Sequence, residues 1–345
     1  MSPAVGGGGA VAFVLVPVVV GDFWLSVLTY AGIFAIAALG LSLLTGYAGQ
    51  VSVGHAFFMG VGAYVGVYFG AGRGLPLPVW LVLAGLAGAA AGAVVAPAAL
   101  RLSGLYLAMV TVGLLFVGVH VWNNFESVTG GAAGIAGEAP ARLGPLDFND
   151  LRLAGQTYSR NQSWFWLVWA LAAVAAVLVR NVTRSRVGRA MQAVRDSPVG
   201  AAAVGIDVQR TKLAAFVSSS LLAAVAGGLY FAFVQYVSPE EWGLALSVNL
   251  LAMLIIGGMA TWWGAIVGAT VLGGAPRAVE ELTARVPAVT SVGLSAAELN
   301  QLLLGVLIVI FVMFQPEGLV GAWVRARTRI ETLRRRPSPP ERLLR

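Results

Sequence analysis

Residues 180–212 read RNVTRSRVGRAMQAVRDSPVGAAAVGIDVQRTK. This stretch, here called the basic segment, holds six arginines and the only lysine of the chain, Lys212, against two acids, Asp196 and Asp207. It lies between two long apolar runs in a chain that is 58% hydrophobic and only 11% charged. Because lysine and arginine concentrate in the short cytoplasmic loops of membrane proteins, the basic segment predicts the side of the membrane on which each loop lies.

Apolar runs of membrane-spanning length recur along all 345 residues, and the mean hydropathy is +0.83. A helix needs about 20 apolar residues to cross the hydrocarbon core. The 44 glycines suit transmembrane helices that pack closely. These features predict an all-α, polytopic membrane protein with about ten transmembrane helices, in a range of about eight to ten. The expected spans are 4–21, 23–45, 51–70, 78–100, 103–122, 162–180, 213–235, 244–260, 263–280 and 298–315.

The charge distribution predicts the topology. With the basic segment in the cytoplasm, counting spans in both directions places both termini inside. The loops left outside carry more acidic than basic residues. The inner side carries an excess of basic residues, which gives the chain its formal net charge of +7. We expect one transmembrane domain over residues 1–320, with an inner loop at 181–212 and an outer loop at 123–161. The basic tail, 321–345, is expected to be cytoplasmic and disordered.

Composition also limits the function. The positive charge is explained by topology, with some contact to anionic membrane lipid, so no nucleic-acid partner is expected. The chain has no cysteine, and we expect no metal ion or other cofactor. No charged residue falls at the centre of an expected span, which argues against an ion-coupled carrier. The same absence removes acid–base pairs, so the sequence predicts no catalytic residues and no enzyme.

The basic segment has the pattern of two short helices. Small or apolar residues at Val187, Ala190, Met191 and Val194 recur at helical spacing and predict an amphipathic helix over 186–196. A second, shorter helix is expected to follow after a sharp turn.

The turn between these helices is marked by capping residues. Ser197 is a good N-cap, and Pro198 suits the first helical position, where no amide hydrogen bond is lost. The second helix would run over 198–204 and stop at Gly205, a residue type that favours the position after a helix end. Its small apolar face consists of Val199, Ala202, Ala203 and Ile206.

Two interpretations of this two-helix element stay open. It can be an anchor that lies on lipid headgroups, or a docking surface for a cytoplasmic partner. The capped turn and the small apolar residues favour docking, because a plain anchor needs neither. The chain has no G-x-x-x-x-G-K-[ST] phosphate loop, so an ATP-driven process would require a separate ATPase subunit.

Residues 46–55, here called the glycine segment, read GYAGQVSVGH and lie between the second and third expected spans. Irregular backbone at membrane depth is tolerated where it is buried in protein or lines a cavity, and it can present polar groups to a solute. The pathway candidates in this segment are Gly49, Gln50, Ser52, Gly54 and His55. The structural alternative is a tight turn between helices in which His55 bonds a neighbour.

Neutral polar residues elsewhere in the expected spans include Ser218–Ser220, Asn249 and Gln301. A pathway lined by such groups and by apolar side chains suits a small solute with an apolar side chain. Asn249 is a further pathway candidate, although a hydrogen bond across helices would explain it equally. A second glycine-rich turn at 256–264 is either half of an internal repeat or another close turn.

The glycine segment, with its continuation to Tyr64, resembles the signature of branched-chain amino-acid ABC transporter permeases of the LivM type. Similar stretches in the basic segment are Gly188-Arg189-Ala190, Ala193-Val194-Arg195-Asp196 and Val204-Gly205-Ile206. Others are Thr129-Gly130-Gly131, Ala226-Gly227-Gly228, Val237-Ser238-Pro239-Glu240 and Gly257-Gly258-Met259. The resemblance covers about residues 25–320. It departs at Ser197-Pro198, where an acidic or alanine-rich helix is expected in the family.

The resemblance implies a multi-pass permease in the bacterial cytoplasmic (inner) membrane. It would work with a second homologous permease, two cytoplasmic ATPase subunits and an extracytoplasmic substrate-binding protein. The implied solutes are leucine, isoleucine and valine, with urea, short amides or other small acids as alternatives. The residues implied in ATPase coupling are Gly188, Arg189, Val194, Arg195, Asp196, Ser197, Pro198 and Gly205. A stand-alone channel or carrier remains the competing function.

Overall fold

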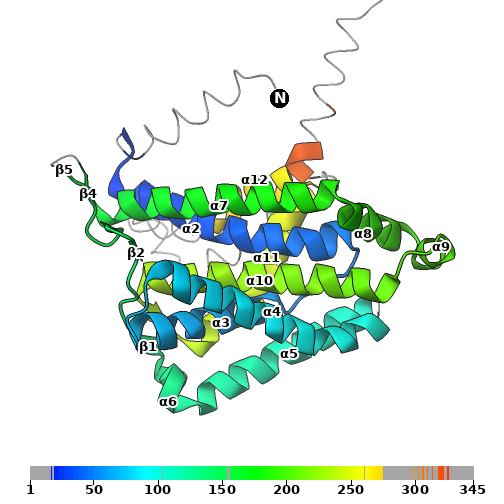
Figure 1. Cartoon of the computed structure of the whole chain (residues 1–345), viewed down its shortest axis with the longest axis horizontal. Helices are drawn as coiled ribbons and strands as arrows, with labels where there is room; N and C mark the ends of the chain where they lie inside the picture. The colour runs from blue at the N-terminus through cyan, green and yellow to red at the C-terminus, as the bar shows by residue number, and fades with distance from the viewer. Residues whose placement is uncertain are drawn as a thin grey trace, which may run out of the picture.

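Helix α2 (Asp22–Leu41) lies at the centre of a bundle of roughly parallel and antiparallel helices (Figure 1). The computed structural model describes residues 17, 19–102, 104–153, 156–259 and 261–274, together with isolated positions between 298 and 325. Most of α2 is buried, and its neighbours include α7, α10 and α12. Alanine and glycine allow this central position, since a Cβ on Gly32 would approach Val168 Cγ1 to 2.7 Å.

Five helices in the described part are long and apolar enough to span a membrane. They are α2 continued by the π-helix η1 (Ser42–Tyr47), α4 (Leu77–Arg101), α5 (Leu105–Asn124), α7 (Arg160–Arg184) and α10 (Val208–Val234). Three shorter apolar helices accompany them: α3 (His55–Val65) continued by η2 (Gly66–Ala71), α11 (Leu244–Gly257) and α12 (Trp262–Gly273). Each predicted span from 23–45 to 263–280 contains one of these helices. The predicted spans 4–21 and 298–315, and the predicted tail 321–345, lie outside the described residues except for isolated positions.

Glycines permit very close helix contacts, among them those that join α10 to α3 and α4. A Cβ on Gly62 of α3 would overlap the carbonyl oxygen of Ala224 in α10. Reciprocally, a Cβ on Gly227 of α10 would overlap the carbonyl of Met59 in α3. Such contacts between backbones require glycine, because a carbonyl cannot move aside as a flexible side chain can.

Gly62→Val is therefore expected to destabilise the bundle by about 1–3 kcal/mol or more, because the added side chain must push α3 away from α10. Gly113→Val is the matched control, since Gly113 is also helical, in α5, but has open space at its Cβ position. Thermal unfolding of the two purified variants in the same detergent measures the difference. Equal melting temperatures for both variants would contradict the close packing of α3 on α10.

The outer loop 123–161 is folded and contains short β-strands, so the prediction of an all-α protein was wrong in this loop. It contains α6 (Glu126–Thr129), the 3-10 helix η3 (Gly131–Ala133), β1 (Ile135–Ala136), β2 (Arg142–Leu143), β3 (Leu146–Asp147), β4 (Arg152–Leu153) and β5 (Gln156–Thr157). Strand β1 pairs antiparallel with β6 (Tyr236–Val237), which follows α10. This pairing ties the outer loop to the segment between α10 and α11. Strands of two residues are too short to show an alternating pattern, so the sequence did not predict them.

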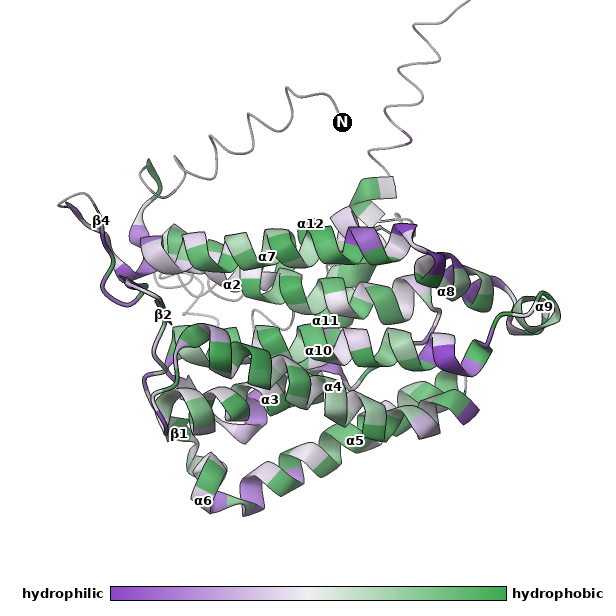
Figure 2. Cartoon of the chain, viewed as in Figure 1, coloured by the Kyte–Doolittle hydropathy of each residue, from purple (hydrophilic) through white to green (hydrophobic). Residues whose placement is uncertain are grey.

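Hydrophilic residues collect at the two ends of the bundle, while its middle is apolar (Figure 2). Helices α4 and α10 are antiparallel, since Gly85 faces Val225 and Gly92 faces Ser220. Arg101, at the end of α4, therefore lies at the same end of the bundle as Arg210 and Lys212, at the start of α10. The strands of the outer loop lie at the opposite end (Figure 1).

Candidate functional site

The basic segment forms the two short helices predicted from its sequence, α8 (Arg186–Asp196) and α9 (Pro198–Ala203). Both project at one end of the bundle, beyond the ends of α7 and α10 (Figure 1). We call α8 and α9 together the projecting element. Its two helices connect α7 to α10, so a force on the element acts on both long helices.

The predicted turn of this element is confirmed residue by residue. The Ser197 hydroxyl accepts a hydrogen bond from the Gly200 amide (3.0 Å), and Pro198 is the first residue of α9. Gly205 follows the end of α9 with a φ of +84°, a left-handed conformation that favours glycine. Ser185 caps α8 in the same way, which the sequence analysis did not predict.

The predicted apolar face of α8 is wrong at one position. Met191 and Val194 are buried as expected, but Val187 is 47% exposed and Gly188 is buried in its place. A Cβ on Gly188 would overlap the carbonyl oxygens of Val182 and Thr183 in the last turn of α7. Close backbone contact with α7 therefore decides which side of α8 faces inward.

Helix α9 leaves its predicted apolar face uncovered. Val199 of this face is 82% exposed, and Val204, which was not assigned to the face, is 76% exposed; Ala201 points inward and is buried. Val199 and Val204 thus leave the tip of this charged element apolar and uncovered.

The glycine segment leaves the helical path just after η1 and re-enters a helix at His55. The π-helix widens the last turn, and the backbone N–H of Gln50 then donates to the Leu44 carbonyl (3.0 Å). Gly49 takes a φ of +68°. Gly54 permits close contact with α5, because a Cβ there would overlap the carbonyl of Thr111. The interrupted backbone predicted for this segment is thus confirmed.

Polar side chains from three other helices surround this segment. The Val53 amide donates to the Thr111 hydroxyl (3.0 Å), and the Ala56 amide donates to the Ser247 hydroxyl (3.0 Å). Ser219 Oγ lies 3.4 Å from His55 Nε2. Thr111, Ser219 and Ser247 are all fully buried, and they come from α5, α10 and α11. The neutral polar cluster is therefore assembled from segments far apart in the sequence.

Several polar atoms in this cluster lack hydrogen-bond partners among the described residues. They are both side-chain amide atoms of Gln50, the Ser52 hydroxyl and Nδ1 of His55. These three side chains are at most 4% exposed. An unpaired buried polar group costs about 1–3 kcal/mol, so groups of this kind commonly bind water or a ligand.

The projecting element contacts the glycine segment directly. The Arg195 guanidinium donates through Nη1 to the Gly46 carbonyl (2.9 Å). A Cβ on Gly49 would lie 2.7 Å from Arg195 Cγ and 3.3 Å from Arg195 Cα, so Gly49 sits against α8. The two groups of candidates, predicted separately, therefore meet at Arg195.

The remaining predicted residues have different positions. Asp196 pairs with Arg195 at 3.0 Å on the surface, and Arg189 is exposed and donates to the Arg184 carbonyl. Asn249 is half-buried in α11, but it is two residues beyond Ser247 and so lies on another face of the helix. Thr111 and Ser247 were missed, because a single hydroxyl residue in an apolar helix has no local pattern.

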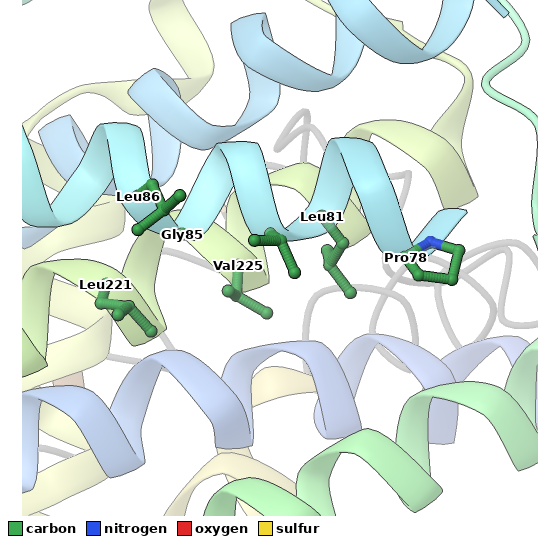
Figure 3. Close-up of a pocket in the computed structure, with 7 residues that line it drawn as sticks. Pro78, Leu81, Gly85, Leu86, Leu221 and Val225 are labelled. Atoms are coloured by element: carbon green, nitrogen blue, oxygen red, sulfur yellow. The ribbon is translucent and has the colours of Figure 1, made fainter. Parts of the chain in front are cut away.

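An open apolar groove of about 300 Å³ lies between α4 and α10 (Figure 3). Its lining comprises Pro78, Leu81, Val82, Gly85, Leu86, Leu221 and Val225. The groove offers no polar side chain that could orient a polar solute, and Val82 and Leu86 are mainly exposed. It suits an apolar surface such as a lipid chain, so the buried polar cluster is the better candidate for a solute pathway.

Apolar helices of membrane-spanning length, an interrupted helix with buried neutral polar groups and a projecting basic element define a multi-pass membrane protein of the transport type. Comparison with known proteins gives the family. Residues 23–312 match the model of the family described as branched-chain amino acid transport system / permease component, and the chain belongs to this family.

Its relatives include the high-affinity branched-chain amino acid transport system permease protein LivM of Escherichia coli, which is 31% identical over 88% of this chain and 71% of the relative. LivM of Salmonella typhimurium is also 31% identical, over 85% of this chain and 68% of the relative. The LivH permease of E. coli is 25% identical over 85% of this chain and 92% of the relative. No solved structure matches the chain.

Proposed function

We propose that this chain imports leucine, isoleucine, valine or a closely related small solute, as one permease subunit of an ATP-driven importer in the bacterial cytoplasmic membrane. The names of its LivM and LivH relatives support this solute class. The neutral, buried polar cluster around the glycine segment supports it independently, because it suits a small solute with an apolar side chain. Permeases of the same type for urea, short amides or other small acids are the alternative.

The proposed topology has both termini and the projecting element in the cytoplasm. Arg101, Arg184, Arg210 and Lys212 all lie at the end of the bundle that carries this element, as the positive-inside rule requires. The outer loop, with β1 paired to β6, then faces the side where a substrate-binding protein would deliver solute.

The proposed mechanism rests on one observation, the contact between Arg195 and the glycine segment. Two cytoplasmic ATPase subunits, one bound to this permease and one to a homologous partner, would close on binding ATP. Their closure would push the exposed tip of α9 and shift α8 with it. Arg195 would pass the shift to Gly46 and Gly49, while the ends of α7 and α10 move together. The pathway would thereby open alternately to the two sides.

A stand-alone channel or carrier is the competing function, and reconstitution separates the two. The chain is co-expressed with candidate ATPase, permease and binding-protein subunits, and the purified complex is placed in vesicles. We expect leucine to accumulate inside only with the binding protein outside and hydrolysable ATP at the projecting element. Equilibration of leucine by the chain alone, without ATP, would establish the channel instead.

A further inference from the structure

A second group of unpaired polar atoms lies near the outer loop, far along α3 from the glycine segment. They are Oε2 of Glu241, the hydroxyl of Tyr64 and Nε1 of Trp242; none makes a hydrogen bond of ordinary geometry with the described residues, although the Trp242 N–H faces the Tyr64 hydroxyl. Trp242 is fully buried and Tyr64 is 6% exposed. Nothing in the coupling mechanism above uses these three side chains.

The three groups belong to elements that are packed together. Glu241 and Trp242 lie in the 3-10 helix η4 (Pro239–Trp242), which contacts α3, α5, η3 and α11. Tyr64 lies near the outer end of α3, where its hydroxyl is close enough to Glu241 for the two to interact electrostatically. The Trp242 ring meets the ring of Tyr230 edge to face, with centroids 5.5 Å apart.

The carboxyl of Glu241 is in an environment that disfavours its charge. Burial raises the pKa of Glu241 to about 7. No ion pair to Glu241 occurs within the described ranges. The next residue back, Glu240, is exposed, and Tyr236 is 40% exposed. Glu241 is itself partly exposed, so η4 lies at the surface on the side of the outer loop.

Nε of Arg160 also has no hydrogen-bond partner among the described residues near this end, but the rest of the Arg160 side chain has a structural role. The Arg160 guanidinium donates to the carbonyls of Ala232 and Phe233 and so caps the end of α10. It also lies over the ring of Trp164, at 5.5 Å. Glu241 has no comparable structural task in the described part of the chain.

We propose that Glu241, Tyr64 and Trp242 form an outer binding site for the ammonium group of an amino-acid solute. This inference rests on the proposed function for the solute class. A carboxylate and a phenol oxygen both accept hydrogen bonds from an ammonium ion, and aromatic faces attract a cation. The indole N–H of Trp242 is a donor that faces the Tyr64 hydroxyl, so Trp242 would orient this acceptor toward the ammonium group. Solute binding would thus give Glu241 and Tyr64 a hydrogen-bond donor and favour the ionised form of Glu241.

The test uses the full-length chain in lipid nanodiscs at about pH 8, where the Glu241 carboxyl is ionised. Calorimetry measures binding of isopentylammonium, which is leucine without its carboxylate, and of isocaproate, which is leucine without its amine. Glu241→Gln should weaken isopentylammonium binding by about tenfold or more, because it removes the charge that the cation pairs with. Glu240→Gln is the matched control, since this neighbouring carboxylate is exposed, and it should change binding by less than about twofold.

Tyr64→Phe provides a second variant in case Glu241→Gln is unstable, and it should weaken isopentylammonium binding by a few-fold. Isocaproate should bind more weakly than isopentylammonium. Equal affinity of the wild-type chain and of both variants for isopentylammonium would refute the proposed binding site. It would show that these polar groups bind ordered water instead of the solute. The proposed function is read from ATP-dependent uptake instead, so loss of uptake with intact, Glu241-dependent ammonium binding would refute the transport proposal and leave the site standing.

Discussion

Two aspartates at the tip of α9, in the double variant Val199→Asp/Val204→Asp, are expected to abolish binding of the ATPase subunits and to reduce ATP-dependent uptake to background. Both valines are more than three-quarters exposed, at 82% and 76%. If they enter an apolar pocket of an ATPase, a charge at either position would be buried without a partner. That cost reaches several kcal/mol per group, enough to dissociate an interface of ordinary affinity.

Co-purification of the ATPases with a tagged permease measures this effect. Val187→Asp is the control, because it places one new negative charge on an exposed valine of α8, away from the tip. Melting temperatures of the isolated permease should stay equal for all variants, since none of these side chains is buried. Retention of the ATPases by the double variant would favour the competing interpretation, in which the projecting element only anchors the chain on lipid headgroups.

The second large effect is expected for Gly49→Ala, which should lower ATP-dependent uptake at least about tenfold while the complex still assembles. The new Cβ would lie 2.7 Å from Arg195 Cγ, so α8 and the glycine segment must separate. The separation would weaken the hydrogen bond from Arg195 to the Gly46 carbonyl, which joins the two elements.

A backbone effect must be separated from this contact effect. Gly49 has a φ of +68°, where alanine costs about 1–2 kcal/mol whatever its surroundings. Gly74→Ala carries the same backbone cost, since Gly74 has a φ of +64°, but nothing lies within 4 Å of its Cβ position. Uptake by Gly74→Ala should therefore stay within about twofold of wild type. Equal losses in the two variants would show that backbone strain, and not contact with Arg195, causes the defect.

Local features of this protein were predictable from its sequence, because short-range chemistry determines them. Ser197, Pro198 and Gly205 fix the turn and the end of α9 through capping and left-handed backbone, and the structure has all three as expected. Val187 was misplaced because hydrophobic periodicity favours valine over glycine. The inward side of α8 is instead set by how closely Gly188 approaches α7.

Long-range features were not predictable in this way. Arg195 and Gly46 are 149 positions apart, and nothing near either residue indicates the other. Thr111 and Ser247 are single hydroxyl residues in apolar helices, and their role appears only when α5 and α11 reach the glycine segment. The unpaired groups of Glu241, Tyr64 and Trp242 likewise became visible only through tertiary packing.

In the proposed mechanism, Arg195 carries the motion of the projecting element to the glycine segment. The most direct measurement is the number of leucine molecules imported per ATP hydrolysed, determined in the same reconstituted vesicles for wild type and Gly49→Ala. We expect Gly49→Ala to continue to hydrolyse ATP while this ratio falls at least about tenfold. An unchanged ratio, with uptake and hydrolysis reduced together or not at all, would contradict it.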